Sequence, residues 1–430
     1  MTARNTTSTT TATTIGTTSV TDSATQQHTA VSGDLVALRR RLHGIPEVGL
    51  DLPQTQEALL AELEGLPVGI VLGEGLSSIA VTIEGTRPGP AVLLRSDMDA
   101  LPVVELTGLD YASANGAMHA CGHDLHMAAL VGAIRLLCAR RDELSGTVMA
   151  IFQPGEEGYG GAEKMVAEGV LGLTGALPIA SYGLHVFSFL TAGDFFCRPG
   201  TIMAGTHNFD LEIIGKGGHA ARAYGASNPI LVASLVVQAI QSYATQKTRP
   251  DDPIIATVGA FNGGTAANVI PERTVIRVSL RALTSERLGE VFEEISAIAD
   301  GIARGFGQTT AVTAGLPLPP TISSPGEDEF VGHAVAELFG PERYRVLSVS
   351  EMISEDFSYF LDATGGAFLF LGAAVEGDHG PFGPPSNHSP LVRFDDSVVG
   401  DGALLLADLA MRRLRMGAPE TPGIAPEEVG

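Results

Sequence analysis

A cysteine and a histidine stand two residues apart in the segment 118–126, whose sequence is MHACGHDLH. Alternate residues of an extended backbone project to the same side, so Cys121 and His123 can face one point. Gly122 between them can adopt backbone angles closed to other residues, which keeps the turn open. Thiolate and neutral imidazole are preferred ligands of zinc and related metals. An isolated Cys-x-His is more often a buried cysteine near scattered histidines, so the metal hypothesis depends on partners elsewhere in the chain.

Two adjacent glutamates, Glu156 and Glu157, are the next candidates for chemistry. Side chains of neighbouring residues diverge, so one carboxylate can bind a metal ion while the other stays free. A free carboxylate beside a metal can accept a proton from water, as a general base does. The alternative is an exposed acidic turn, which is the commoner setting of a Glu-Glu pair.

Two further histidines complete a possible ligand set. His185 lies in the apolar run YGLHVF and could instead be a core histidine satisfied by hydrogen bonds. His388 lies in the segment PPSNHSP and could equally be a surface residue. Together with Cys121, His123 and Glu157 they exceed the four ligands of a closed tetrahedral site. Two ions about 3.5–4 Å apart would use such a set better.

The elements that must position these residues have an α/β pattern. Short apolar runs at 91–94, 148–152 and 182–184 each end in polar residues. Helical segments separate the first two runs and follow the second, which is typical of a mostly parallel sheet covered by helices on both faces. Functional groups of such sheets gather beyond the carboxyl ends of the strands, where the acids and histidines of this chain stand. Asp124 is expected at the N-cap of the helix that carries 127–137.

The pattern changes near residue 200 to that of a smaller α+β unit with an antiparallel sheet. After residue 320 the α/β pattern returns, with a helix at 328–339, a strand at 367–371 and a last helix through 411. The smaller unit is therefore predicted to be inserted into the larger one. Its predicted elements are a strand over 209–215, a helix over 229–243, strands over 254–260 and 274–280, a helix over 285–303 and a strand over 309–314.

Composition limits the partners and the compartment. The net charge is −23, from 49 acidic and 26 basic residues, which disfavours nucleic acids and anionic membranes. Three cysteines are too few for a disulfide scaffold, and this fits a reducing compartment. The N-terminus shows no secretory signal, and no apolar run has the length of a membrane span. We expect a cytoplasmic protein that acts on a small molecule.

Six motifs, in order along residues 32–413, resemble the dinuclear-metal aminoacylase and carboxypeptidase superfamily. Within it they resemble the branch of hippurate hydrolases, auxin-conjugate amidohydrolases and N-acyl-amino-acid deacylases. The motifs are LLRSDMDALP (93–102), MHACGHD (118–124), QPGEEG (153–158), GKGGHAA (215–221), GGTAANVIP (263–271) and SEDF (354–357).

The resemblance implies hydrolysis of the amide bond of N-acyl or N-aroyl amino acids to a carboxylic acid and a free amino acid. The alternative within the superfamily is a dipeptidase or carboxypeptidase that cuts small peptides. Two divalent ions per subunit (zinc, manganese, nickel or cobalt) are implied, with a homodimer formed through the lid. The implied division is a disordered threonine-rich leader over 1–30, a catalytic domain over 31–200 and 316–415, an inserted lid and dimerisation domain over 201–315, and a loose tail over 416–430.

Carried over by matching position, each candidate residue receives a role. Glu156 would be the general base that acts on a metal-activated water, and His219 would stabilise the oxyanion, in some relatives across a dimer interface. Asn268 and Arg281 would meet the substrate carboxylate. The metal ligands would be Cys121, His123, Glu157, His185 and His388, and the residues that orient them would be Asp97, Asp99 and Asp124.

Some lid positions depart from the branch. Ala223 and Tyr224 replace a usual proline and histidine, and Val278 replaces a usual glycine. These changes bear on the substrate and on the position of the lid more than on the metal centre.

Two other classes of protein could contain these residues. A thiol hydrolase would use Cys121 as nucleophile with His123 or His126 as base, but it leaves Glu156 and His388 without a role. A binding module that had lost its chemistry would lack a ligand or the base, and none is missing.

Overall fold

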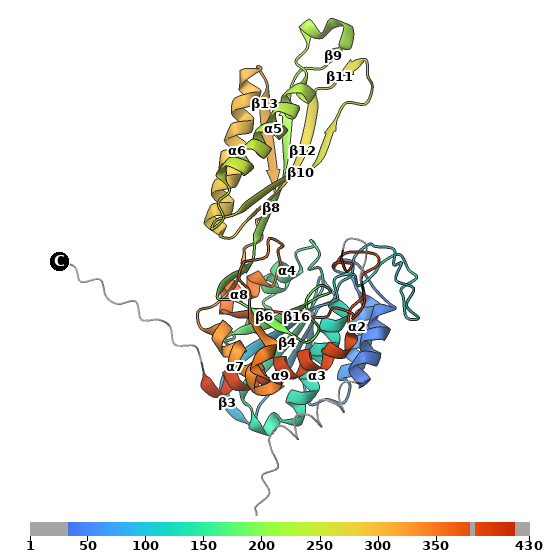
Figure 1. Ribbon diagram of the computed structural model, residues 1–430, viewed down its shortest axis with the longest axis vertical. Helices are drawn as coiled ribbons and strands as arrows, with labels where there is room; N and C mark the ends of the chain where they lie inside the picture. The colour runs from blue at the N-terminus through green and yellow to red at the C-terminus, as the bar shows by residue number, and fades with distance from the viewer. Residues whose placement is uncertain (1–32, 379–382, 418–430) are drawn as a thin grey trace, which may run out of the picture.

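The computed structural model describes residues 33–378 and 383–417. The leader predicted over 1–30 lies outside these residues, as does the predicted tail from 418 onwards. Figure 1 shows a larger body that contains both ends of the described chain and a slimmer body that stands on it. The slimmer body is built from the middle of the chain, which fits an insertion.

An eight-stranded mixed sheet forms the centre of the larger body. Its four middle strands, β4, β3, β5 and β16, run parallel, and every residue of β5 and β16 is buried. The strands β1 and β2 at one edge run antiparallel, as does β6 against β16. The predicted mostly parallel sheet is therefore confirmed at its centre. In sheet order the strands are β1 Gly69–Leu72, β2 Ile79–Glu84, β4 Ser145–Gln153, β3 Arg87–Asp97, β5 Ser181–Phe187, β16 Gly366–Gly372, β6 Phe195–Cys197 and β15 Tyr344–Val346.

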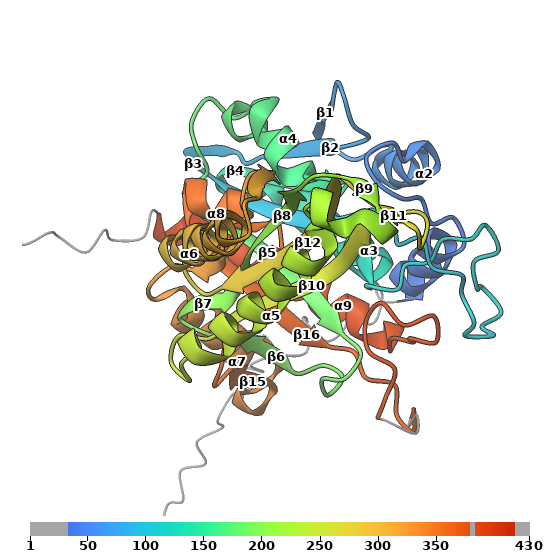
Figure 2. The same cartoon turned by 90° about the horizontal axis from the view of Figure 1, so that it is seen from above.

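Helices cover both faces of this sheet (Figure 2). On one face, the helix at 33–43 and the helices α2, α3, α7 and α9 enclose the main core of leucine, isoleucine and valine. On the other face, α4 and α8 enclose a second core rich in phenylalanine. These helices are α2 Pro53–Leu63, α3 His123–Ala139, α4 Gly161–Ala167, α7 Glu327–Phe339, α8 Ser358–Thr364 and α9 Val399–Met416.

The slimmer body, called the lid below, is a four-stranded antiparallel sheet with two helices on one face. The buried and less buried residues of β8 alternate, as expected for a sheet with one covered face. The side chains of Asn228 and Thr284 cap the two helices by accepting from Ile230 N and Arg287 N. In chain order the elements are β8 Gly205–Ile214, α5 Pro229–Lys247, β10 Ile254–Gly263, β12 Arg273–Ala282, α6 Ser285–Gly305 and β13 Thr309–Ala314, as predicted in kind and order.

Short pairs of strands complete the described structure. β9 (Gly218–His219) pairs with β11 (Val269–Ile270) at the tip of the lid, far from the larger body (Figure 1). β7 (Gly200–Met203) pairs with β14 (Thr321–Ser323) where the two bodies join. None of the helices in the described ranges has the length and apolarity that a bilayer crossing needs.

The start of α3 differs from the prediction. Asp124 is not the N-cap: Gly122 takes that position, in the left-handed region with φ 90°, and Asp124 is the second residue of the helix. Only glycine adopts this angle readily. A Cβ at Gly122 would also lie 2.3 Å from Val186 Cγ2. The left-handed turn brings Cys121 and His123 together, in place of the extended backbone that we expected.

The close packing of α3 against α9 yields a test of the core. A Cβ added at Gly132 would lie 2.6 Å from Leu35 Cδ1 and 2.7 Å from Ala403 Cβ. Although alanine favours helix, we expect Gly132→Ala to lower the free energy of unfolding by about 1–3 kcal/mol through overpacking. Urea unfolding measures it. The matched control is Gly301→Ala in α6, where no atom lies within 4 Å; it should raise stability by about 0.5–1 kcal/mol. Equal effects of the two changes would contradict the packing argument.

Candidate metal centre

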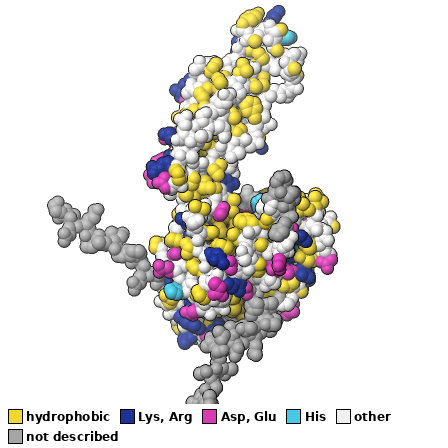
Figure 3. Space-filling view, in the orientation of Figure 1, with side chains coloured by type: hydrophobic (Ala, Val, Ile, Leu, Met, Phe, Trp, Pro, Cys, Tyr) yellow, Lys and Arg dark blue, Asp and Glu magenta, His cyan; other side chains and the backbone are white. Residues whose placement is uncertain are grey.

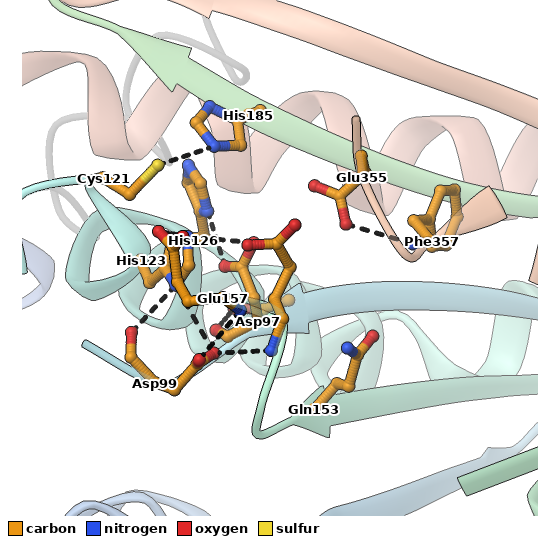
Figure 4. Close-up of polar contacts among 12 residues, drawn as sticks. Asp97, Asp99, Cys121, His123, His126, Gln153, Glu157, His185, Glu355 and Phe357 are labelled. Atoms are coloured by element: carbon orange, nitrogen blue, oxygen red, sulfur yellow. Dashed lines mark hydrogen bonds and ion pairs between the residues drawn. The ribbon is translucent and has the colours of Figure 1, made fainter. Parts of the chain in front are cut away.

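The candidate residues of the larger body gather at the carboxyl ends of its parallel strands (Figure 4). Asp97 is the last residue of β3, Glu156 and Glu157 follow β4, and His185 lies near the end of β5. Cys121 and His123 come from the turn that begins α3. Parallel strands end at the same edge of a sheet, so separate stretches of sequence meet there, as predicted.

Cys121 and Glu157 connect three histidines. Cys121 Sγ lies 3.3 Å from His185 Nε2 and 3.2 Å from His388 Nε2. Glu157 Oε1 lies 3.2 Å from His388 Nε2 and 3.9 Å from His123 Nε2. The structure therefore brings all five predicted ligands into one cluster.

This donor set fits divalent transition metals. Ligand atoms lie within 4.8 Å of one another in the group Cys121, His123 and His185, and likewise in the group Cys121, Glu157 and His388. His123 Nε2 and Glu157 Oε1 are buried and make no hydrogen bond of good geometry among the described residues, although His388 Nε2 lies 3.2 Å from Glu157 Oε1. Buried polar atoms of native proteins are nearly always paired, so two such atoms facing a cluster of donors indicate a cation. Thiolate, imidazole and carboxylate together suit zinc and its neighbours.

Backbone oxygens orient two of the imidazoles. His123 Nδ1 lies 2.8 Å from the backbone oxygen of Asp99, and His185 Nδ1 lies 2.9 Å from that of Val186. Each ring therefore donates its Nδ1 proton to the backbone. Its Nε2 then carries no proton and faces the cluster as a possible metal-binding atom. Contacts of this kind are the usual means by which a protein fixes the tautomer of a metal-binding histidine.

Asp99 also holds the two glutamates. Its carboxylate oxygens accept hydrogen bonds from Glu156 N and Glu157 N, at 3.0 and 3.1 Å. One acid just beyond β3 thus fixes the turn after β4. This contact is the route by which the predicted orienting role of Asp99 would act. Oxygen atoms of both glutamates and a ring nitrogen of His123 lie within 4.8 Å of one another, so the two carboxylates face the same region and do not diverge as expected.

Asp97 contacts His126, a residue that the sequence suggested only as the base of a thiol hydrolase. His126 Nδ1 donates to Asp97 Oδ1 at 2.6 Å, and His126 Nε2 accepts from Val186 N at 2.8 Å. The pairing of β3 with β5 ends at Gly183, so the imidazole of His126, and not a residue of β3, accepts the hydrogen bond from Val186 N. The sequence did contain a signal for this role of His126: it lies three residues after His123, which puts both on one face of α3.

The side chain of Asp124 contacts residues other than the five clustered side chains. Its Oδ2 lies 2.8 Å from both Arg39 Nε and His43 Nδ1. His43 Nε2 lies 3.2 Å from Glu105 Oε1, so one imidazole stands between two carboxylates. Burial opposes the charge on His43, but Asp124 and Glu105 outweigh it and raise the pKa of His43 above 6.5. This ion cluster anchors the first turn of α3.

Glu156 lies among acids. Oxygen atoms of Glu156, Glu355 and Asp356 lie within 4.8 Å of one another. Burial raises the pKa of Glu156 well above its ordinary value, and the charges of Glu355, Glu157 and Asp356 raise it further. Arg95 is the nearby counter-charge, with a guanidinium nitrogen 2.8 Å from Glu355 Oε1 and 3.1 Å from Asp356 Oδ1. Glu355 and Asp356 both belong to the motif SEDF, but the sequence indicated no role for either.

The structure does not bring His219 and Asn268 to this cluster within one chain. His219 is exposed in β9, and its Nδ1 accepts from Ala221 N at 3.1 Å. Asn268 directly precedes β11 at the same tip of the lid. Arg281 lies at the other end of β12, at the base of the lid, where it donates to Met352 O at 3.0 Å and to Ser354 Oγ at 3.3 Å. The length of β12 separates Asn268 from Arg281 by on the order of 25 Å.

Comparisons with known proteins agree with this site. The model of the peptidase family M20/M25/M40 matches residues 93–412. The IAA-amino acid hydrolase ILR1-like 5 of Arabidopsis thaliana is 36% identical over 386 residues, which cover 88% of this chain and 86% of the relative. The hippurate hydrolase of Campylobacter jejuni is 30% identical, covering 90% and 98%. Among solved structures, the YXEP protein of Bacillus subtilis, a dinuclear metal binding peptidase, matches with a TM-score of 0.76 and 28% identity over 90% of this chain and 99% of that one.

The His43 ion cluster predicts a pH-dependent stability. His43 is charged in the folded protein at pH values where it is neutral when unfolded, so its contribution is complete below pH 6.5 and disappears as pH rises through its raised pKa. We expect His43→Gln to cost about 2 kcal/mol of unfolding free energy at pH 6 and less at pH 9. Urea unfolding of parent and variant at both pH values measures the difference. The exposed His333→Gln is the control. A cost of His43→Gln that grows with pH would contradict the assignment.

Proposed function

The chain belongs to the peptidase family M20/M25/M40, and from this premise we propose that it hydrolyses the amide bond of N-acyl or N-aroyl amino acids. The products would be a carboxylic acid and a free amino acid. Two relatives at 36% and 30% identity support this substrate class, because they are an IAA-amino acid hydrolase and a hippurate hydrolase. The observation that carries the proposal is the cluster of five donors with Glu156 beside it.

Two divalent ions belong to the site, and we propose which residues hold them. The convergence of Nε2, Sγ and carboxylate atoms supports Cys121, His123, Glu157, His185 and His388 as the ligands. Thiolate and imidazole favour zinc by affinity, and manganese, nickel and cobalt are the other candidates. When bound, such ions polarise the scissile carbonyl and lower the pKa of the attacking water.

Glu156 is the proposed general base. Its carboxylate would take a proton from the attacking water and then deliver this proton to the leaving amine nitrogen. A glutamate of ordinary pKa holds a proton poorly near neutral pH. Burial and the neighbouring acids raise the pKa of Glu156, and this supports the double role, because a carboxylate with a raised pKa accepts and carries a proton more readily than an ordinary glutamate.

A homodimer through the lid is proposed because one chain leaves its site incomplete. His219 and Asn268 lie at the tip of the lid, away from the cluster (Figure 1). A second copy could present its own His219 to support the oxyanion and Asn268 to bind the substrate carboxylate. Arg281 would act on that carboxylate from the base of the lid.

Apolar side chains on the lid support this dimer. Leu231 of α5, Phe261 of the edge strand β10 and Val269 of β11 are exposed by 64%, 40% and 51%. Figure 3 shows hydrophobic side chains spread over one face of the lid. An edge strand beside exposed apolar residues is a common site of self-association.

The same geometry bears on the alternative functions. A dipeptidase or carboxypeptidase would use the same metal centre on small peptides. A thiol hydrolase is disfavoured because burial raises the pKa of the Cys121 thiol, whereas a nucleophilic cysteine needs a lowered pKa. The three cysteines are all free, which supports the cytoplasm as the proposed location.

A substrate screen tests the function. Protein stripped of metal and reloaded with zinc, manganese, nickel or cobalt should hydrolyse N-acetyl-, N-benzoyl- or longer N-acyl-amino acids faster than dipeptides. In Glu156→Gln the metal content should stay unchanged while kcat falls by about 10²- to 10⁴-fold. Amine release and elemental analysis measure the two properties. Faster cleavage of dipeptides would favour the peptidase alternative, and an active Glu156→Gln would reject the base.

Mixing two inactive variants tests the dimer. In a mixed dimer of Glu156→Gln and His219→Ala, the subunit that keeps Glu156 would receive an intact His219 from its partner. Random re-association should therefore restore roughly a quarter of the parent activity, because half of the dimers are mixed and each holds one complete site. Activity is assayed after reversible dissociation. No recovery from two folded, dimeric variants would mean that His219 acts within its own chain or not at all.

A further inference from the structure

His388 is held in a strained backbone conformation. Among non-glycine residues in the described ranges it alone has a positive φ, at 71°. The left-handed region costs a non-glycine residue about 1–3 kcal/mol and persists only where surrounding contacts impose it. His388 N donates to Ala120 O at 2.8 Å, but this bond alone leaves the rest of the 383–390 loop free to turn. Something else must hold the segment against relaxation.

The neighbouring amide of Asn387 makes the contacts that can do so. Its Nδ2 donates to Cys121 O at 3.2 Å and to Val186 O at 3.0 Å. Its Oδ1 accepts from Ser188 N at 3.2 Å, and Ser188 Oγ lies 3.3 Å away but has its shorter contact, 2.8 Å, with Pro385 O. Both amide protons and the amide oxygen of Asn387 are therefore engaged, which fixes which way the amide faces.

These contacts join the three segments that carry Cys121, His185 and His388. Cys121 supplies one carbonyl directly, and Val186 directly follows His185. The Val186 oxygen also accepts the Nδ1 proton of His185, so one oxygen orients both the ligand and the amide. The amide therefore fixes the distances among three metal-binding atoms whose residues lie 64 to 267 positions apart in the sequence.

We propose that Asn387 is a positioning residue of the metal centre, which holds the loop of His388 against the segments of Cys121 and His185. The inference rests on the proposed ligand set. Asn387 Nδ2 donates to two backbone oxygens and also lies 4.0 Å from Cys121 Sγ. Without it, the strained backbone at His388 relaxes and its Nε2 moves away from Cys121 Sγ.

Other contacts also hold the loop, but each reaches a single segment. Leu106 N donates to Pro390 O at 2.8 Å, and Ser188 Oγ donates to Pro385 O at 2.8 Å. Among the described residues, the side chain of Ser389 makes only a local contact, in which its Oγ accepts from Leu391 N at 3.2 Å. Loss of Asn387 should therefore alter the metal centre while the loop stays attached, and Ser389 supplies a matched control in the same loop.

The test uses the full-length protein loaded with Co²⁺. We expect Asn387→Leu, which nearly keeps the size of the side chain, to weaken Co²⁺ affinity by about 10- to 100-fold in competition with a chelator. The sulfur-to-cobalt absorption band should shift or lose intensity. With N-acyl substrate, excess metal should restore much of kcat, and KM should stay near the parent value. Asn387→Ala should behave in the same way, whereas Ser389→Ala should leave affinity and spectrum unchanged.

The outcomes separate this inference from the proposed function. Parent-like affinity and spectrum in both Asn387 variants would overturn the positioning role and leave the ligand set intact. If both variants are unfolded without metal, as measured by circular dichroism, Asn387 supports the fold in general, and the inference is also overturned. In the same assay Cys121→Ser should abolish the sulfur-to-cobalt band. A band that survives in Cys121→Ser would instead reject the proposed ligand set.

Discussion

Two buried atoms, His123 Nε2 and Glu157 Oε1, set the constraint on which the larger body depends. Neither makes a hydrogen bond of good geometry among the described residues, although His388 Nε2 lies 3.2 Å from Glu157 Oε1. A buried polar atom left unpaired costs about 1–3 kcal/mol, so a chain free to relax would turn these side chains elsewhere. Asp99 prevents this, because its backbone oxygen holds the ring of His123 and its carboxylate holds the backbone of Glu157. The protein thus keeps donor atoms facing one another at a point where a cation satisfies them.

The balance of charge around this point explains the setting of the base. One guanidinium, Arg95, contacts Asp97, Glu355 and Asp356, so negative charge exceeds positive charge in this buried region. The excess favours cations. It also favours the protonated forms of the acids: burial and the charge of Glu355 raise the pKa of Asp356 to about 7, although Arg95 opposes this. The same burial and negative charge raise the pKa of Glu156, the proposed general base.

The lid is stabilised by a core of its own. Its own core lies between α5, α6 and one face of its sheet, and it meets the larger body through β7, β14 and the contacts of Arg281. A body with its own core and few connections can rotate as a unit, and domain motion of this kind commonly closes hydrolase sites. The residues at its tip, His219 and Asn268, lie away from the cluster of their own chain.

The sequence by itself determined the elements and the cluster. Apolar runs and helical periodicity predicted the central strands and the order of the lid, because these patterns reflect local burial. The acids and histidines at the ends of β3, β4 and β5 were predictable for the same reason, since parallel strands end at one edge. Only the tertiary structure decided which groups contact each other. It paired Asp124 with Arg39 and His43. It also hydrogen-bonded His126 to Val186 N and Asn387 to Cys121 O. These contacts join residues 60 to 266 positions apart, and no local pattern records a bond between segments that meet only after the chain has folded.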